Sequence, residues 1–243
     1  MFKIENLNKR EYNKTLVGDL NIELHKGEIL GILGDDQSGR KEILDMISGF
    51  KKPNNGKIYI YDKPVLGNVL EARRHIGYSG ALEVYANFTV QGFIKLMSKV
   101  RKIDEGNIEE EINKVLDLVD FDKKLDVKIK DLDEKEQKKL SIATAFIGSP
   151  TIILLDDPFF NMVKEESKEN IANLILKLKK DRVIIIATDD AILEKIADRV
   201  LVLTHKGQIE VDLKEIKENK ISLKEKQKEL LEQNNIKGKH YDK

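Results

Sequence analysis

The segment from residue 28 to residue 50 restricts the possible folds of this chain more than any other. A short apolar run, Glu28 to Leu33, is followed by a loop framed by Gly34 and Gly39. A segment at helical spacing comes next, in which Ile43, Ile47 and Phe50 share one face. A strand that leads through a glycine-framed loop into a helix is the layout of a phosphate-binding loop. The segment therefore indicates an α/β fold with a candidate anion site where one helix begins.

The rest of the chain predicts strands of two kinds. Alternating apolar and polar residues predict half-exposed strands at residues 2–7, 20–24 and 57–61. Continuous apolar runs at 151–155 and 183–188 are typical of central parallel strands. Helices are expected at about 163–180 and 190–197, and a hairpin at 199–211. This alternation of strands and helices implies an α/β sheet.

A helical lobe is expected between the two halves of the sheet. Apolar residues recur at helical spacing near residues 90–148, and 140–147 read as a separate helix after a charged stretch. We therefore predict one domain over residues 1–212, with the helical lobe at about 85–148.

Residues 213–243 are predicted to form a charged, partly helical tail. Ser222 and Glu225 have the spacing of a capping box, which predicts a helix that continues through Gln233. Three apolar side chains could dock this helix on the domain: Leu223, Leu230 and Leu231.

The composition excludes several classes of function. Lysine plus arginine and aspartate plus glutamate each total 43, so the chain lacks a basic excess and we expect no nucleic-acid partner. The absence of cysteine excludes disulfides, thiol nucleophiles and cysteine-bound metals. No apolar run reaches the roughly 18–20 residues of a membrane helix. Charges interrupt the first ten residues, so we expect no signal peptide and a cytoplasmic chain.

Five stretches share their order along the chain with one known family. They are GEILGILG (27–34), NNGKIYIYDKPV (54–65), RRHIGY (73–78), SIATAFIGSPTIILLDDP (141–158) and ADRVLVLTHKGQI (197–209). Together they resemble the nucleotide-binding subunit of an ATP-binding cassette (ABC) transporter over residues 2–212. The resemblance implies a P-loop NTPase-like ABC ATPase fold with a mainly parallel central sheet, an N-terminal antiparallel β subdomain and an inserted helical lobe.

The phosphate loop of that family, G-x-x-x-x-G-K-[ST], is altered in this chain. Arg40 stands where a lysine reaches the β- and γ-phosphates, and Lys41 replaces the hydroxyl that holds magnesium. Asp35 and Asp36 add negative charge to the loop. Two interpretations stay open, a weakened anion site and a turn without a ligand. If a nucleotide binds, the resemblance implies that it contacts Gly34, Ser38, Gly39, Arg40, Lys41 and Tyr12.

Two further nucleotide contacts of the family are altered or uncertain. Tyr12 matches the aromatic residue that stacks on adenine, although an exposed tyrosine in a hairpin is an equal alternative. The family signature L-S-G-G-Q reads Leu132 to Glu136 here, as LDEKE. Its carboxylates would repel a triphosphate where a helix N-terminus should attract one, so we expect a solvated, charged helix start.

The residues that perform hydrolysis in the family are also changed, and we expect none of them to be intact. Asp156 matches the magnesium-binding aspartate and would hold the metal if magnesium nucleotide binds. Asp157 stands at the catalytic glutamate, with a shorter side chain that misplaces a general base. Asp189 replaces the switch histidine, and Ala81 the glutamine that contacts magnesium and water. The next loop carries Phe159 and Phe160, and two alternatives stay open for them, core residues and an exposed apolar contact with a partner.

These observations predict a pseudo-ATPase: an ABC-type transporter subunit, exporter-like, with a structural or regulatory role. The implied partners are a membrane permease and a second nucleotide-binding subunit, in a homodimer or heterodimer on the inner face of the membrane. ATP and magnesium are the implied cofactors, with binding in doubt. Two alternatives stay open: a slow but genuine ATPase that energises transport, and a soluble regulator that senses an anion or a nucleotide.

A permease would dock around residues 79–96. The candidate apolar anchors in this stretch are Val84, Tyr85, Phe88 and Phe93, although Phe93 could equally pack the helical lobe.

Overall fold

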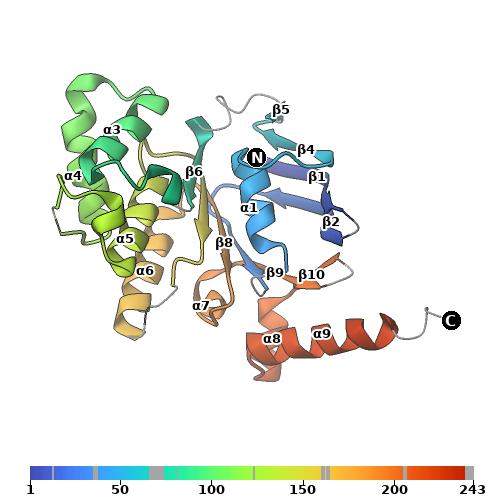
Figure 1. The fold of residues 1–243 in the computed structure, drawn as a ribbon. Coiled ribbons are helices and arrows are strands. Elements are labelled where there is room, and N and C mark those ends of the chain that lie inside the picture. Colours follow the sequence, from blue (N-terminus) through green and yellow to red (C-terminus); the bar gives the residue numbers. More distant parts are fainter. Residues whose placement is uncertain are drawn as a thin grey trace.

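Two β-sheets with one helix between them form the centre of the molecule (Figure 1). This computed structural model describes residues 1–12, 14–34, 38–65, 74–80, 82–122, 124–159, 162, 165–204 and 207–238. The first sheet has the strand order β2-β1-β4-β5 and is antiparallel. Its strands are β1 (Phe2–Glu11), β2 (Lys14–Leu24), β4 (Asn55–Ile60) and β5 (Lys63–Pro64).

The second sheet has the order β10-β9-β3-β8-β7-β6 and is parallel except for the β9–β10 hairpin. Its strands are β3 (Ile29–Leu33), β6 (Ile76–Ser79), β7 (Ile152–Asp156), β8 (Val183–Thr188), β9 (Arg199–Thr204) and β10 (Gly207–Val211). The mainly parallel α/β sheet with an antiparallel N-terminal sheet confirms the predicted fold class.

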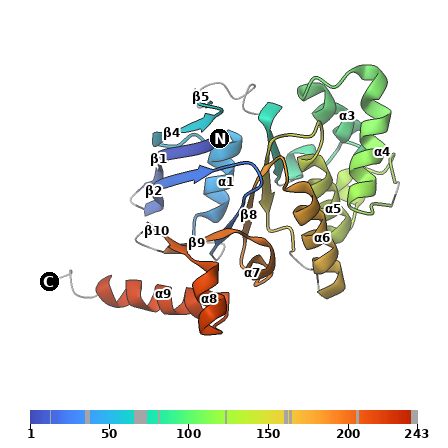
Figure 2. The ribbon, with the colours of Figure 1, turned by 180° about the vertical axis from the view of Figure 1, so that it is seen from behind.

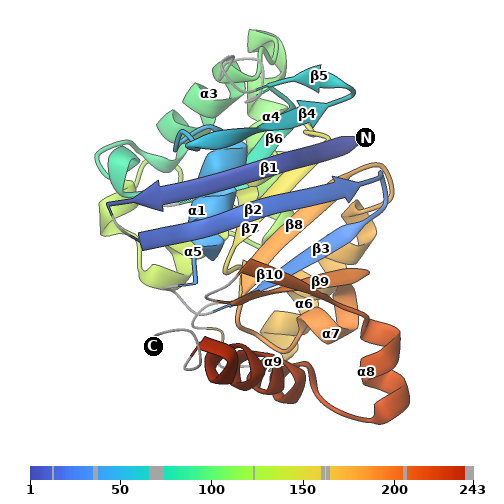
Figure 3. The same ribbon diagram turned by 90° about the vertical axis from the view of Figure 1, so that its right-hand side faces the viewer.

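The helix α1 (Arg40–Ser48) lies between the two sheets (Figure 3). Ile43 and Ile47 pack in one apolar cluster with side chains of both sheets. Ile152 and Leu154 of β7 belong to this cluster, whereas the alternate residues of β7 belong to the cluster on the opposite face. Because both faces of the strand are covered, its sequence is continuously apolar rather than alternating.

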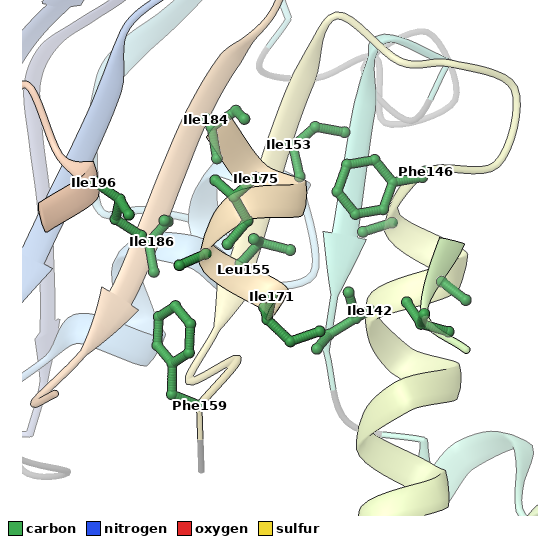
Figure 4. Packing of buried hydrophobic residues seen from close by; sticks show 14 of the residues in the cluster. Ile142, Phe146, Ile153, Leu155, Phe159, Ile171, Ile175, Ile184, Ile186 and Ile196 are labelled. Carbon is green, nitrogen blue, oxygen red and sulfur yellow. The ribbon is translucent and has the colours of Figure 1, made fainter. Parts of the chain in front are cut away.

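Helices cover the opposite face of the parallel sheet (Figure 2). They are α5 (Glu134–Ala145), α6 (Glu165–Leu178) and α7 (Leu193–Ile196), while α3 (Val90–Val100) and α4 (Ile108–Leu118) pack beside α5. Figure 4 shows Ile171 and Ile175 of α6 packed against Ile153 and Leu155 of β7. Phe159 joins this cluster with 2% of its surface exposed, so it is a core residue and not an exposed contact. Phe160 lies outside the described residues.

The C-terminal region continues the domain through two helices, α8 (Leu213–Asn219) and α9 (Leu223–Gly238). The backbone N–H of Ser222 donates to Glu225 Oε2 (2.7 Å), and that of Glu225 donates to Ser222 Oγ (3.2 Å), which confirms the capping box. Helix α9 runs beyond the predicted end to Gly238. Leu223 and Leu230 are buried in the same cluster as β7, so this segment packs on the domain.

Two sequence expectations near the sheets were wrong. Phe50 was expected to share one helix face with Ile43 and Ile47, but α1 ends before Gly49, whose left-handed φ of 80° turns the chain. Phe50 is consequently 52% exposed and contacts the ring of Tyr78. Helix α5 begins six residues earlier than expected, because the charged stretch caps its first turn. Within the described residues, no helix has the length and apolar character that a membrane span requires.

Candidate functional site

The candidate site lies where three adjacent parallel strands end. Gly34 follows β3, Thr188 ends β8 and Asp156 ends β7, and β8 pairs with both of the other strands. The carboxyl ends of parallel strands are where α/β sheets place ligands. The predicted order of strand, loop and helix is confirmed, with α1 starting after Gly39 at a left-handed φ of 89°. A Cβ at Gly39 would lie 2.1 Å from the carbonyl oxygen of Leu16, so only glycine fits there.

Arg40 joins the two ends of this site. Its side chain is buried, and its Nη1 donates to the carbonyl oxygen of Gly34 at 2.8 Å. Its Nη2 forms an ion pair with Asp157 Oδ2 at 3.3 Å. The guanidinium group therefore bridges the end of β3 and the residue that follows β7.

Lys41 pairs with the neighbouring carboxylate. Its Nζ donates to Asp156 Oδ2 at 3.2 Å, and its side chain is 46% exposed. Burial opposes the charge on Lys41, but the carboxylates of Asp156 and Asp45 outweigh burial and raise its pKa. Lys41, which replaces the magnesium-binding hydroxyl of the family, thus supplies a cation that pairs with Asp156, the residue predicted to hold the metal.

Both carboxylate oxygens of Asp157 have protein partners. Thr188 Oγ1 donates to Oδ1 at 2.6 Å, and Arg40 binds Oδ2. Burial raises the pKa of Asp157, and the hydrogen bond from Thr188 and the charge of Arg40 oppose that rise. A general base must reach and deprotonate a water molecule. In this structure both oxygens of the Asp157 carboxylate are engaged by side chains of the same chain.

Lys138 of α5 was not singled out by its sequence. Its Nζ donates to the backbone carbonyl oxygen of Asp156 at 2.8 Å. Burial lowers the pKa of Lys138, and the carboxylates of Asp156 and Asp157 oppose that effect. It stands in a lysine-rich run, and no motif or spacing distinguishes it from its neighbours. Only the packing of α5 on β7 brings this third cation to the site.

The start of α5 carries a reciprocal capping box. Asp133 Oδ1 accepts from the N–H of Glu136 at 2.8 Å, and Glu136 Oε2 accepts from the N–H of Asp133 at 3.1 Å. The expected charged helix start is therefore present, and two of its backbone donors are satisfied within the chain. Two carboxylates stand at a helix end where an anion would otherwise be favoured.

The remaining predicted positions are more scattered. Tyr12 lies in the turn between β1 and β2, and its ring is fully exposed. This exposure agrees both with a residue that stacks on adenine and with an exposed tyrosine in a hairpin. Asp189 is exposed and follows β8 directly, whereas Ala81 lies outside the described residues. Ser38 lies close to Gly34, because a Cβ on Gly34 would meet Ser38 Oγ at 2.2 Å. No group of three potential metal-ligating His, Cys, Asp or Glu side chains occurs among the residues described.

Two hollows adjoin the charged cluster. A polar cleft of about 760 Å³ lies between the end of β7, α5 and α6, and its lining includes Lys41, Lys138 and Asp156. A groove of about 410 Å³ lies between α1 and α3, and most of its lining side chains are apolar. Phe50, Val84 and Tyr85 are among the residues that line this apolar groove.

The comparisons with known proteins agree with this architecture. Residues 17–160 match the family model described as ABC transporter. The chain is 30% identical over 186 residues to ABC transporter A family member 1 of Dictyostelium discoideum, covering 76% of this chain. It is 30% identical over 210 residues to a spermidine/putrescine import ATP-binding protein of Fusobacterium nucleatum, covering 82% of this chain. The matched regions span 21% and 54% of those two relatives.

A solved structure gives the same result for the fold. It is a dimeric ATP-binding cassette in a post-hydrolysis state bound to ADP and phosphate, with a TM-score of 0.79 and 20% identity. The similarity covers 88% of this chain and 99% of the cassette. Together with the family match over more than half of the 243 residues, these findings establish that the chain belongs to the ABC transporter family, as an ATP-binding cassette.

Proposed function

We propose that this cassette has lost ATP hydrolysis and serves as a structural or regulatory subunit of an export permease. The observation that carries the proposal is the state of Asp157, whose two oxygens are held by Thr188 and Arg40. In the family this position supplies the group that polarises the attacking water. Losing one preorganised transition-state group costs on the order of 10²–10³ in rate.

The start of α5 supports the same proposal, because it occupies the signature position with which a cassette completes the site of its partner subunit. In the family, two cassettes sandwich the nucleotides, and each site combines the phosphate loop of one subunit with the signature of the other. Here the signature position carries the Asp133–Glu136 capping box. This chain would therefore weaken the site on its own phosphate loop and the site that it completes on a partner.

The apolar groove supports a permease as the partner. Val84 is 79% exposed and Phe50 is 52% exposed, and both line this groove. Phe88, 42% exposed, makes an edge-to-face contact with Tyr85, whereas Phe93 is buried and packs the helical lobe. A photo-crosslinker placed at Val84 should capture an integral membrane protein, and capture of soluble proteins alone would contradict this assignment.

The test of lost hydrolysis is phosphate release by the purified protein with ATP and magnesium, alone and with vesicles of the host membrane. We expect no release above that of Asp156→Ala, measured as the matched control. Magnesium-dependent turnover that Asp156→Ala abolishes would instead establish a slow, genuine ATPase. To distinguish export from import, transport would be measured in vesicles of known orientation.

A further inference from the structure

Five charged side chains from three segments meet at the end of β7. Arg40 and Lys41 come from α1, Asp156 and Asp157 from β7 and the residue after it, and Lys138 from α5. The contacts are Arg40 with Asp157, Lys41 with Asp156, and Lys138 with the carbonyl oxygen of Asp156. The cluster contains three cations and two carboxylates, so its own side chains more than neutralise its acids.

A magnesium ion does not fit this arrangement. Magnesium requires oxygen ligands in near-ideal octahedral geometry. Lys41 occupies the sequence position of the ligating hydroxyl and also holds Asp156 Oδ2. The carbonyl oxygen of Asp156 already accepts from Lys138. A divalent cation placed at Asp156 would therefore lie close to the ammonium groups of Lys41 and Lys138 and be repelled by their charge.

Unlike a bound metal ion, the ammonium group of Lys138 is part of the chain and cannot leave the site. It is attached to α5, and a second hydrogen bond close by, from Ser141 Oγ to the carbonyl oxygen of Gly80 at 2.7 Å, ties the same helix to the end of β6. The described contacts use one of the three N–H donors on each of the two lysines. The polar cleft opens onto both lysines, so their remaining donors face a space that a ligand can enter.

We propose that Lys138 is a built-in substitute for the divalent metal, and that this site binds a di- or triphosphate group without magnesium. Lys41 and Lys138 bind the phosphate oxygens, while Arg40 stays paired with Asp157 at one end of the site. A metal-free triphosphate carries more negative charge than its magnesium complex. The site therefore favours the free anion over the complex that a hydrolysing cassette uses. The inference concerns the site of the proposed function and rests on it only for the absence of turnover.

The experiment is calorimetric titration of the full-length protein with inorganic triphosphate and with ATP, each in EDTA and in excess magnesium. We expect binding in EDTA at least as tight as binding in magnesium. Lys138→Met should weaken it at least tenfold, and Lys138→Arg should largely restore it. Lys130→Met, which removes the same charge from an exposed site outside the cleft, should leave binding within twofold. Thermal unfolding of each variant without ligand checks that it folds.

Three outcomes would overturn the inference. They are binding that requires magnesium, no binding of either anion at millimolar concentration, and equal effects of Lys138→Met and Lys130→Met. Magnesium-dependent binding without phosphate release would overturn this inference and leave the proposed loss of hydrolysis standing. Phosphate release with magnesium would overturn that proposed function instead.

Discussion

At the scale of single residues, two adjacent basic side chains have different structural roles. Arg40 is buried and paired with Asp157 and the carbonyl oxygen of Gly34, whereas Lys41 is nearly half exposed. Removing one partner of a buried ion pair leaves an uncompensated charge, while an exposed pair contributes little. Neighbours in sequence therefore differ strongly in what they contribute to stability.

We predict that Arg40→Ala lowers the free energy of unfolding by about 3 kcal/mol, because it leaves the carboxylate of Asp157 without its cation. Lys41→Ala should lower it by less than about 1 kcal/mol. Urea denaturation of both variants measures the difference. Equal losses would mean that Arg40 is not the buried bridge between the two ends of the site.

At the scale of secondary-structure elements, the start of α5 is fixed by its own side chains. The capping box satisfies two backbone donors of the first turn. Asp133→Ala removes the cap and should cost about 1 kcal/mol of stability. Lys135→Ala, on the exposed first turn of the same helix, should change stability by less than about 0.5 kcal/mol. Denaturant unfolding distinguishes them, and similar losses would contradict the assigned role of Asp133.

The β9–β10 hairpin should make a pH-dependent contribution to the free energy of unfolding. Arg199 binds both carboxylate oxygens of Glu210, at 2.6 and 2.9 Å, and this hydrogen-bonded pairing lowers the pKa of Glu210 below 4.5. A lowered carboxyl pKa stabilises the fold above pH 4.5, and that contribution is lost as the pH falls through the folded-state value.

Glu210→Gln should therefore reduce stability at pH 7 by about 0.5 kcal/mol, since the pair is half exposed. The difference from the unaltered protein should vanish near pH 3. Urea unfolding at a series of pH values measures it, with the exposed Glu218→Gln as the control. A difference that persists at pH 3 would contradict an electrostatic origin.

Sequence patterns predicted the elements better than the site. The apolar runs identified β7 and β8, and the glycine-framed loop identified the start of α1, because these features depend on local chemistry. Lys138 could not be predicted, because its role requires the distance between α5 and β7 in space. The burial of Phe159 could likewise not be predicted, because it depends on the apolar side chains of other elements that pack around it.

At the scale of the whole molecule, the C-terminal segment belongs to the same packing unit as the sheet. The core cluster that contains β7 also contains four residues of α8 and α9: Leu213, Ile216, Leu223 and Leu230. The sequence predicted Leu223 and Leu230 as docking residues of α9, whereas α8 was not predicted, since it has only two buried apolar positions and thus a weak periodic pattern. We infer that this segment stabilises the domain.

Leu223→Ala should lower the free energy of unfolding by about 3 kcal/mol, because it leaves a cavity in a fully buried position. Lys224→Ala, its exposed neighbour, should change it by less than about 0.5 kcal/mol. Thermal or urea unfolding of the full chain measures both. A loss below 1 kcal/mol for Leu223→Ala would show that α9 is not docked in solution.

The capping box at the start of α5 also has a consequence for mixtures of subunits. If this chain lacks hydrolysis, as proposed, and competes with an active cassette for the same dimer contacts, every mixed pair contains a helix end already closed by Asp133 and Glu136. With random pairing, the share of fully active pairs then falls as the square of the active fraction. A small excess of this chain would therefore reduce the number of fully active pairs, and its abundance alone would set the size of that reduction.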